Sequence, residues 1–117
     1  MVLASTALGS DSLVRATARF FRVLGDPTRL TILQTLEGGS LTVAELVEAT
    51  GIPRSRLSNH LACLRYCEFV EAEPEGRTVR YSLVDGDVAS LVANASVAAA
   101  RREEHLSSCT RIGPVWV

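Results

Sequence analysis

The stretch LTVAELVEATGIPRSRLSNHLACLR, residues 41–65, decides the fold of this chain. The capping-box sequence TVAE begins at Thr42, and apolar residues follow at helical spacing as far as Gly51, a residue that commonly ends a helix. Pro53 can start another helix that runs to about Cys67, because proline is favoured at the first helical position. Two short helices joined by the turn TGIP are typical of a helix-turn-helix.

The segments on either side supply the other expected elements. Residues 12–24 place apolar side chains on one helical stripe, and Asp26 with Pro27 can cap and start a second helix. Residues 69–83 alternate around a Pro-Glu-Gly turn, which predicts a β-hairpin. From residue 87 to about 105 an alanine- and valine-rich stretch predicts a final helix.

This order of elements predicts an α+β, mostly helical fold: a winged helix-turn-helix with about five helices plus a β-hairpin wing. In such a domain the second helix enters the major groove of DNA, and the hairpin reaches the backbone beside it. The same arrangement also suits a small domain that contacts proteins instead. For 117 residues, about half of them apolar, we expect a single domain, 1–117, with a flexible C-terminal tail from about residue 106.

Composition limits the classes of function. A net charge of −1 excludes a globally basic nucleic-acid binder but allows a local basic face. The chain begins without a basic leader, and no run of about twenty apolar residues lacks a charge, so we expect a cytoplasmic protein without a membrane partner. No nucleophile, base and orienting group stand at recognisable spacing, so we do not expect an enzyme.

A helical wheel of residues 54–67 separates two faces. Leu57, Leu61 and Leu64 fall together and should face the core. The opposite face carries small polar side chains suited to base edges. Arginines at the start of the helix and on the wing suit phosphates, although three glutamates on the wing lower its net positive charge. The candidate DNA-binding residues are Arg54, Ser55, Arg56, Ser58, Asn59, His60, Arg77 and Arg80.

Cys63 and Cys67 lie on the flank between these faces, about 40° apart on the wheel. Residues four apart on a helix hold their Cβ atoms about 5–6 Å apart, so two thiolates can share one metal ion, whereas a disulfide needs a tighter pair. The pair alone leaves three interpretations open: free structural cysteines, part of a metal site, or a redox pair. Cys109 favours the metal site, because it follows the last helix in a polar tail where burial gives no reason for a cysteine.

The segments LGDPTRLTIL, LTVAELVEATG, SRLSNHLACLR and EGRTVRYSL stand in the order and spacing of a known family. Over roughly residues 13–100 the chain resembles the ArsR/SmtB family of metal-responsive repressors, and within it the cadmium- and lead-sensing CmtR group. The resemblance implies a homodimer joined through the first and last helices, with each subunit bound to half of an inverted repeat in double-stranded operator DNA. It also implies repression that a soft metal ion relieves.

The resemblance extends to the cysteines. NHLACLRYC carries the group's two recognition-helix cysteines, here Cys63 and Cys67, and Cys109 stands where the group has its C-terminal cysteine. These three are the candidate metal ligands. Three thiolates favour Cd(II) or Pb(II), with Hg(II) or As(III) as further options, over Mg(II), Ca(II) or Mn(II). His60 and His105 are weaker candidate ligands, and a thiol-redox repressor of the same fold is the alternative function.

Two other metal sites of the family are missing. LTVAELV lacks the cysteines of the arsenic or cadmium site in the third helix. The last helix lacks the Asp, His, His, Glu pattern of zinc sensors: Asp87 is present, but Ala89 and Ala100 occupy positions where histidine would be wanted. Pro53 also replaces the usual Ser or Thr cap of the recognition helix.

Overall fold

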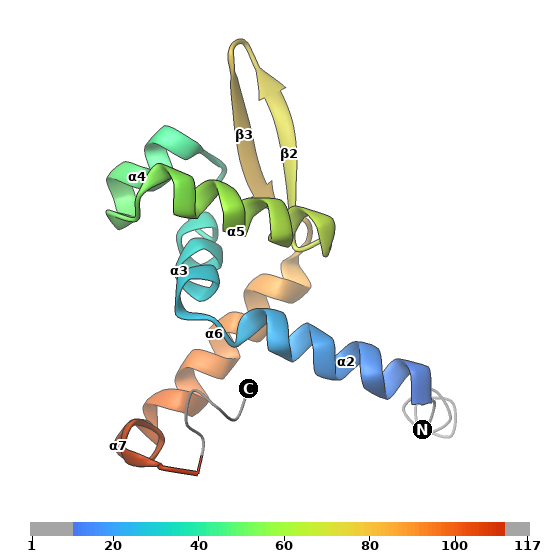
Figure 1. Ribbon diagram of the computed structural model, residues 1–117, viewed down its shortest axis with the longest axis vertical. Coiled ribbons are helices and arrows are strands. Elements are labelled where there is room, and N and C mark those ends of the chain that lie inside the picture. Colours follow the sequence, from blue (N-terminus) through green and yellow to red (C-terminus); the bar gives the residue numbers. More distant parts are fainter. Residues whose placement is uncertain (1–10, 112–117) are drawn as a thin grey trace.

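The computed structural model describes residues 11–111. Within this range the elements are α2 (Asp11–Leu24), α3 (Pro27–Leu36), β1 (Leu41–Thr42), α4 (Val43–Thr50), α5 (Arg54–Tyr66), β2 (Val70–Glu75), β3 (Thr78–Leu83), α6 (Gly86–Ala100) and α7 (Glu103–Ser108). The predicted winged helix-turn-helix is confirmed: α4 and α5 form the helix-turn-helix, and the hairpin β2–β3 is the wing (Figure 1). No helix between residues 11 and 111 has the length and apolar character needed to cross a membrane.

Capping residues set the helix boundaries, as the sequence predicted. The Asp26 carboxylate accepts a hydrogen bond from the backbone N–H of Arg29 at 3.0 Å and so caps α3. At the start of α4 the Thr42 hydroxyl accepts from the N–H of Glu45 at 3.2 Å, and the Glu45 carboxylate accepts from the N–H of Thr42 at 2.9 Å. Gly51, with a φ of 74°, ends α4 in the left-handed conformation that favours glycine.

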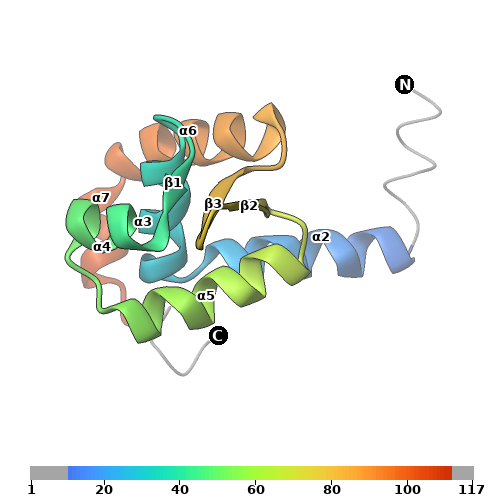
Figure 2. The same ribbon diagram turned by 90° about the horizontal axis from the view of Figure 1, so that it is seen from above.

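One hydrophobic core joins the helices to the base of the wing. Helix α3 lies at its centre and packs against α2, α4, α5 and α6 (Figure 2). The rings of Phe20 and Phe69 stack with centroids 4.8 Å apart and attach the C-terminal half of α2 to the base of the wing. The buried members of the core are Leu24, Ile32, Leu33, Leu36, Leu46, Leu57, Leu61, Leu64, Phe69, Val70, Val88 and Val92.

The sheet has one strand more than the predicted hairpin. Its antiparallel order is β1-β3-β2, with Leu41 opposite Tyr81 and Thr42 opposite Arg80. Strand β1 has only two residues, too few for an alternating pattern to be recognised in a sequence. It matters because it ties the wing to the first turn of α4.

The turn of the wing also differs from the prediction. The expected Pro-Glu-Gly turn is wrong, since Pro74 pairs with Val79 inside the ladder and the turn consists of Gly76 and Arg77. Proline fits there because β2 is an edge strand, where its missing N–H need not remove a ladder hydrogen bond. The shift moves Arg77 to the tip of the wing.

The predicted single helix from residue 87 to about His105 is wrong as well. Helix α6 ends at Ala100, and α7 continues through Ser108, so the segment expected as a tail from about residue 106 begins inside a helix. The Arg102 guanidinium donates a hydrogen bond to the carbonyl oxygen of Ala98 at 2.7 Å. In a continuous α-helix this oxygen would accept from the backbone N–H of Arg102. Neither glycine nor proline marks this break in the sequence.

Candidate functional site

Helix α5 presents the face predicted to bind DNA. Leu57, Leu61 and Leu64 are fully buried, which fixes the rotation of the helix about its axis. The predicted opposite face is exposed, and Tyr66 at its C-terminal end is 89% exposed. Within residues 11–111 the side chains of Ser55, Ser58 and Asn59 make no hydrogen bond, so their donors and acceptors face solvent. The division of α5 into a core face and an exposed polar face is confirmed.

The arginines predicted to bind DNA fall into two groups. Arg54 and Arg56 on the first turn of α5 and Arg77 at the wing tip are exposed, and they make no ion pair with any residue between 11 and 111. Arg54 and Arg77 both line a hollow of about 200 Å³ between the start of α4, the start of α5 and the wing. Their charge is therefore available to an anion from outside the chain.

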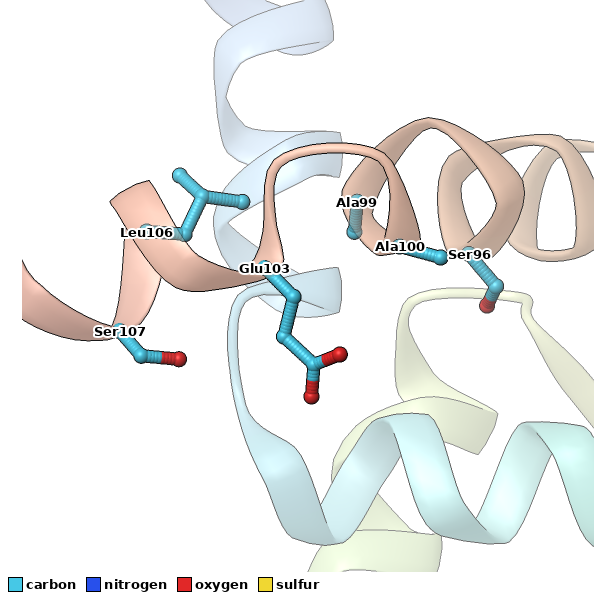
Figure 3. Close-up of a pocket in the computed structure, with 6 residues that line it drawn as sticks. All are labelled: Ser96, Ala99, Ala100, Glu103, Leu106 and Ser107. Carbon is cyan, nitrogen blue, oxygen red and sulfur yellow. The ribbon is translucent and has the colours of Figure 1, made fainter.

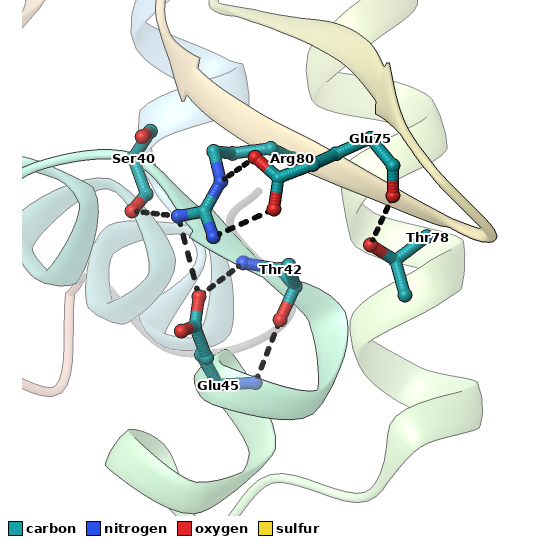
Figure 4. A network of polar contacts seen from close by, with 6 residues as sticks. All are labelled: Ser40, Thr42, Glu45, Glu75, Thr78 and Arg80. Carbon is teal, nitrogen blue, oxygen red and sulfur yellow. Dashed lines mark hydrogen bonds and ion pairs between the residues drawn. The ribbon is translucent and has the colours of Figure 1, made fainter.

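Arg80 is engaged inside the molecule instead (Figure 4). Its Nε and Nη2 donate to the two oxygens of Glu75 at 2.8 and 3.1 Å, and its Nη1 donates to the carbonyl oxygen of Ser40 at 2.9 Å. Nη1 also lies 3.4 Å from Oε1 of Glu45, the oxygen that completes the capping box of α4. The Arg80 guanidinium holds the pKa of the Glu75 carboxyl below its usual range.

This network was missed by sequence reasoning. The residues that Arg80 contacts from the loop before β1 and from α4 are distant from it in the chain, and no local pattern marks them. The sequence marks Glu45 as part of a capping box, but it marks neither Glu45 nor Glu75 as a partner of Arg80. Only the pairing of β1 with β3 brings Ser40 and Glu45 to the wing.

The two cysteines of α5 lie together on its flank, where the wheel predicts them. Cys67 is the C-cap residue, and its backbone N–H donates to the carbonyl of Cys63 at 3.0 Å. Cys63 is half-buried, Cys67 is exposed, and both are free thiols. Burial, the neighbouring Cys63 and a hydrogen bond between the two side chains raise the pKa of Cys67, while the charge of Arg29 lowers it. A metal ion that binds Cys67 must displace its proton.

The end of α5 is sharply defined, and this fixes Cys67. The N–H of Phe69 donates to the carbonyl of Leu64 at 2.8 Å, and the N–H of Glu68 donates to the carbonyl of Arg65 at 3.1 Å. Glu68 has a φ of 64°, the left-handed conformation that this type of helix end requires. The pair of thiols is therefore held by a rigid helix and its closing turn.

His60 lies on the inner flank of α5. Its Nδ1 is 4.0 Å from Oδ2 of Asp26, the oxygen that also caps α3, and its side chain is 22% exposed. This is the position of a boundary residue between two helices. The structure does not place His60 with the exposed polar residues of α5 or in a cluster with the thiols.

Cys109 lies apart from the other two cysteines in one protomer. It follows α7, at the far end of α6 from the wing, and is half-buried (Figure 1). Across the described range, 11–111, no three Cys, His, Asp or Glu side chains gather in a group that could hold a metal ion. His105 is exposed on α7 and likewise joins no such group.

Two surfaces outside the core carry apolar groups. On α2, Val14 and Phe21 are each 53% exposed and border a hollow of about 300 Å³ with almost purely apolar walls. A second hollow, of about 320 Å³, lies where α6 meets α7 (Figure 3). Its lining includes Ala99, Ala100 and Leu106, and Leu106 is 46% exposed.

Comparison with known proteins agrees with this architecture. Residues 26–72 match the family described as bacterial regulatory protein, arsR family. The chain is 50% identical over 96 residues to a probable mercury resistance operon repressor of Streptomyces lividans, with 82% of this chain and 77% of that protein covered. It is 49% identical over 74 residues to the HTH-type transcriptional regulator CmtR of Mycobacterium tuberculosis, and the match covers 63% of each, less than two thirds of that protein's length.

A solved structure gives the same result for the fold. The homodimeric winged helix-turn-helix DNA-binding domain of Mb0332 from Mycobacterium bovis superposes with a TM-score of 0.72 and 34% identity, over 82% of this chain and 92% of that one. The family match spans α3 to β2 and so includes the whole helix-turn-helix. The chain belongs to the arsR family of bacterial regulatory proteins.

Proposed function

We propose that this chain is a metal-responsive transcriptional repressor, which binds operator DNA as a homodimer and leaves it when a thiophilic metal ion binds Cys63, Cys67 and Cys109. One observation carries the proposal: two adjacent free thiols lie on the flank of the helix whose exposed face suits the DNA major groove. A ligand of the thiols therefore acts on the DNA-binding helix itself.

The DNA-binding part of the proposal rests on α5 and the wing. The exposed Ser55, Ser58 and Asn59 can read base edges in the major groove, because each is short and both donates and accepts hydrogen bonds. Arg54, Arg56 and Arg77 lie at the edges of this face and suit phosphates.

The homodimer rests on the apolar surfaces of α2 and of the α6–α7 region. Exposed side chains such as Phe21 and Leu106 would be covered by a second copy of the chain. The similar Mb0332 domain is homodimeric. A two-fold symmetric dimer presents two copies of α5, so its operator should be an inverted repeat.

The metal part of the proposal rests on the donor set. Sulfur ligands favour soft cations, so Cd(II) and Pb(II) are the first choices and Hg(II) or As(III) the next. Cys63 and Cys67 already share one flank of α5. We assign the third thiol of the site to Cys109 of the partner subunit. A probable mercury resistance operon repressor is among the similar proteins, which supports a soft metal inducer.

Release of DNA follows because the metal ion and the operator DNA both bind α5, so the binding of one changes the affinity for the other. A metal ion that joins Cys63 and Cys67 to Cys109 would tie the recognition helix to the C-terminal segment. If that dimer holds its two copies of α5 at the wrong spacing or angle, DNA affinity falls, and DNA weakens metal binding by the same factor. Such couplings typically amount to about 1–3 kcal/mol, a change of roughly 5- to 150-fold in affinity.

The test is fluorescence anisotropy with a labelled duplex recovered from a randomised pool by selection with the metal-free protein. Under anaerobic conditions with a phosphine reductant, we expect tight binding to this duplex, weaker binding to its scrambled sequence, and release when Cd(II) is added. Equal affinity for both duplexes at physiological salt would refute DNA recognition. Asn59→Glu is the control: it should lose the selected duplex and keep Cd(II) binding.

The same experiment separates a thiol-redox repressor from a metal sensor. Adjacent thiols can also be oxidised, and that route needs an oxidant, whereas metal-driven release does not. The raised pKa of Cys67 disfavours the thiolate that both routes require, so the need for an oxidant is what distinguishes them. Release by peroxide after the reductant has been removed, without release by Cd(II), would favour the redox alternative.

A further inference from the structure

We propose that Arg80 does not contact DNA but offsets part of the negative charge of Glu45 and Glu75 beside a hollow in which Arg54 and Arg77 bind a phosphate of the DNA backbone. The inference deepens the proposed DNA-binding function and rests on it. It assigns different roles to arginines that look equivalent in the sequence.

The hollow is formed by three elements that would border DNA together. Thr42, Val43 and Ala44 from the start of α4 line one side, Arg54 comes from the first turn of α5, and Arg77 and Thr78 come from the wing. Its volume of about 200 Å³ is ample for a phosphate group. The two guanidinium groups meet no carboxylate among residues 11–111, so an external anion can bind both.

Two carboxylates beside this hollow would repel a phosphate. Glu45 belongs to the first turn of α4, directly after three of the lining residues, and Glu75 precedes the turn of the wing. Carboxylates next to an anion site oppose anion binding unless a cation compensates their charge. Arg80 supplies that cation, with two hydrogen bonds to Glu75 and an ion pair to Glu45 (Figure 4).

The geometry of Arg80 argues against a direct phosphate contact. All three guanidinium nitrogens already have acceptors: Nε and Nη2 have Glu75, and Nη1 has the Ser40 carbonyl. A phosphate would have to compete with this bidentate bond to a carboxylate for the Arg80 guanidinium. The same contacts join the wing to the loop before β1 and to the first turn of α4.

The test compares the salt dependence of DNA affinity in matched variants of the full chain. A labelled short duplex of arbitrary sequence is sufficient, because phosphate binding does not depend on sequence. The measured quantity is the slope of log association constant against log salt concentration, whose magnitude falls by about 0.9 for each phosphate that the protein no longer neutralises. The double variant Arg54→Gln/Arg77→Gln should reduce the slope by about that amount per subunit, and Arg54→Gln or Arg77→Gln alone should each reduce it by part of that amount.

Arg80→Gln should behave differently. We expect roughly threefold to tenfold weaker binding with an unchanged slope, since two carboxylates lose their counter-charge while every phosphate keeps its arginine. Adding Glu75→Gln should restore the affinity to within about twofold, because the double variant has the same net charge beside the hollow as the parent. Glu71→Gln is the matched control: it removes the same charge from the same strand, makes no bond to Arg80, and should restore less.

Two results would overturn the inference. A drop in slope for Arg80→Gln as large as for Arg77→Gln would show that Arg80 contacts phosphate directly. Unchanged slopes for Arg54→Gln and Arg77→Gln would show that the hollow does not bind one. Failure of the parent protein to bind any duplex at low salt would refute the proposed function instead. Thermal melting of each variant distinguishes a local effect on DNA binding from unfolding.

Discussion

The backbone N–H of Cys67 donates to the carbonyl oxygen of Cys63 at 3.0 Å, so the two thiols lie one helical turn apart at the C-terminal end of α5, the helix that we propose faces DNA. This relationship makes them the preorganised part of the proposed metal site. No folding of a loop is needed to bring them together, whereas Cys109 must come from another segment. The three cysteines should therefore differ in what they contribute to metal affinity and to DNA release.

Changing Cys63 or Cys67 to serine should remove most of the affinity for Cd(II) and the whole response of DNA binding to the metal. A hydroxyl is a poor ligand for a soft cation, and either change leaves one thiol on the helix. The measurement is a Cd(II) titration followed by ultraviolet sulfur-to-metal absorption. The parent should bind one ion per subunit with a sulfur-dominated shell. A nitrogen- or oxygen-dominated shell would contradict the assignment.

Cys109→Ser should weaken Cd(II) binding less than either helix substitution. Cys109 follows α7, apart from the other two thiols, so the chain around it must be repositioned to bind, and fixing backbone costs about 1–2 kcal/mol per residue. Cys109 is nevertheless the ligand that joins α5 to another part of the dimer. The variant should therefore stay on DNA at metal saturation, as measured by anisotropy. If it leaves DNA as readily as the parent does, the pair on α5 alone is the switch.

The affinity for Cd(II) should rise with pH. The pKa of Cys67 is raised in the folded protein, so its proton is held until higher pH than in an ordinary cysteine and opposes metal binding below that pKa. Apparent affinity should increase by about tenfold per pH unit for each proton displaced between about pH 6 and 8. Cys67→Ser should show a shallower dependence. A flat profile in the parent would mean that no thiol proton is displaced.

Leu61→Ala should destabilise the domain by about 2–5 kcal/mol, because it removes most of a fully buried side chain on the core face of α5. Ser58→Ala, one turn away on the exposed face, should change the free energy of unfolding by less than about 0.5 kcal/mol. Urea denaturation of metal-free protein measures both. Similar effects of the two substitutions would contradict the rotation of α5 that buries Leu61 and exposes Ser58.

Much of the fold follows from local chemistry in the sequence. The capping residues Asp26 and Thr42, the left-handed Gly51 and the leucine stripe of α5 each act within a few positions, and all are found as predicted. The break after α6 was not predictable, because neither glycine nor proline marks it in the sequence; in the structure the Arg102 guanidinium donates to the Ala98 carbonyl at this point.

The candidate site was predictable only in part. The flank position of the two cysteines follows from helical geometry, and the structure agrees. The engagement of Arg80 is a long-range effect, since its acceptors are brought together by a two-residue strand. The position of Cys109 relative to α5 depends, in our proposal, on a second copy of the chain, which no single-chain pattern encodes.

The central claim is that filling the thiol site removes the protein from DNA. The most direct measurement is one anaerobic Cd(II) titration of the protein bound to its selected duplex, with sulfur-to-cadmium absorption and DNA anisotropy recorded in the same sample. We expect that anisotropy falls in step with the rise of absorption and that release is complete at one ion per subunit. Anisotropy that stays at the bound value after the absorption has saturated would contradict the claim.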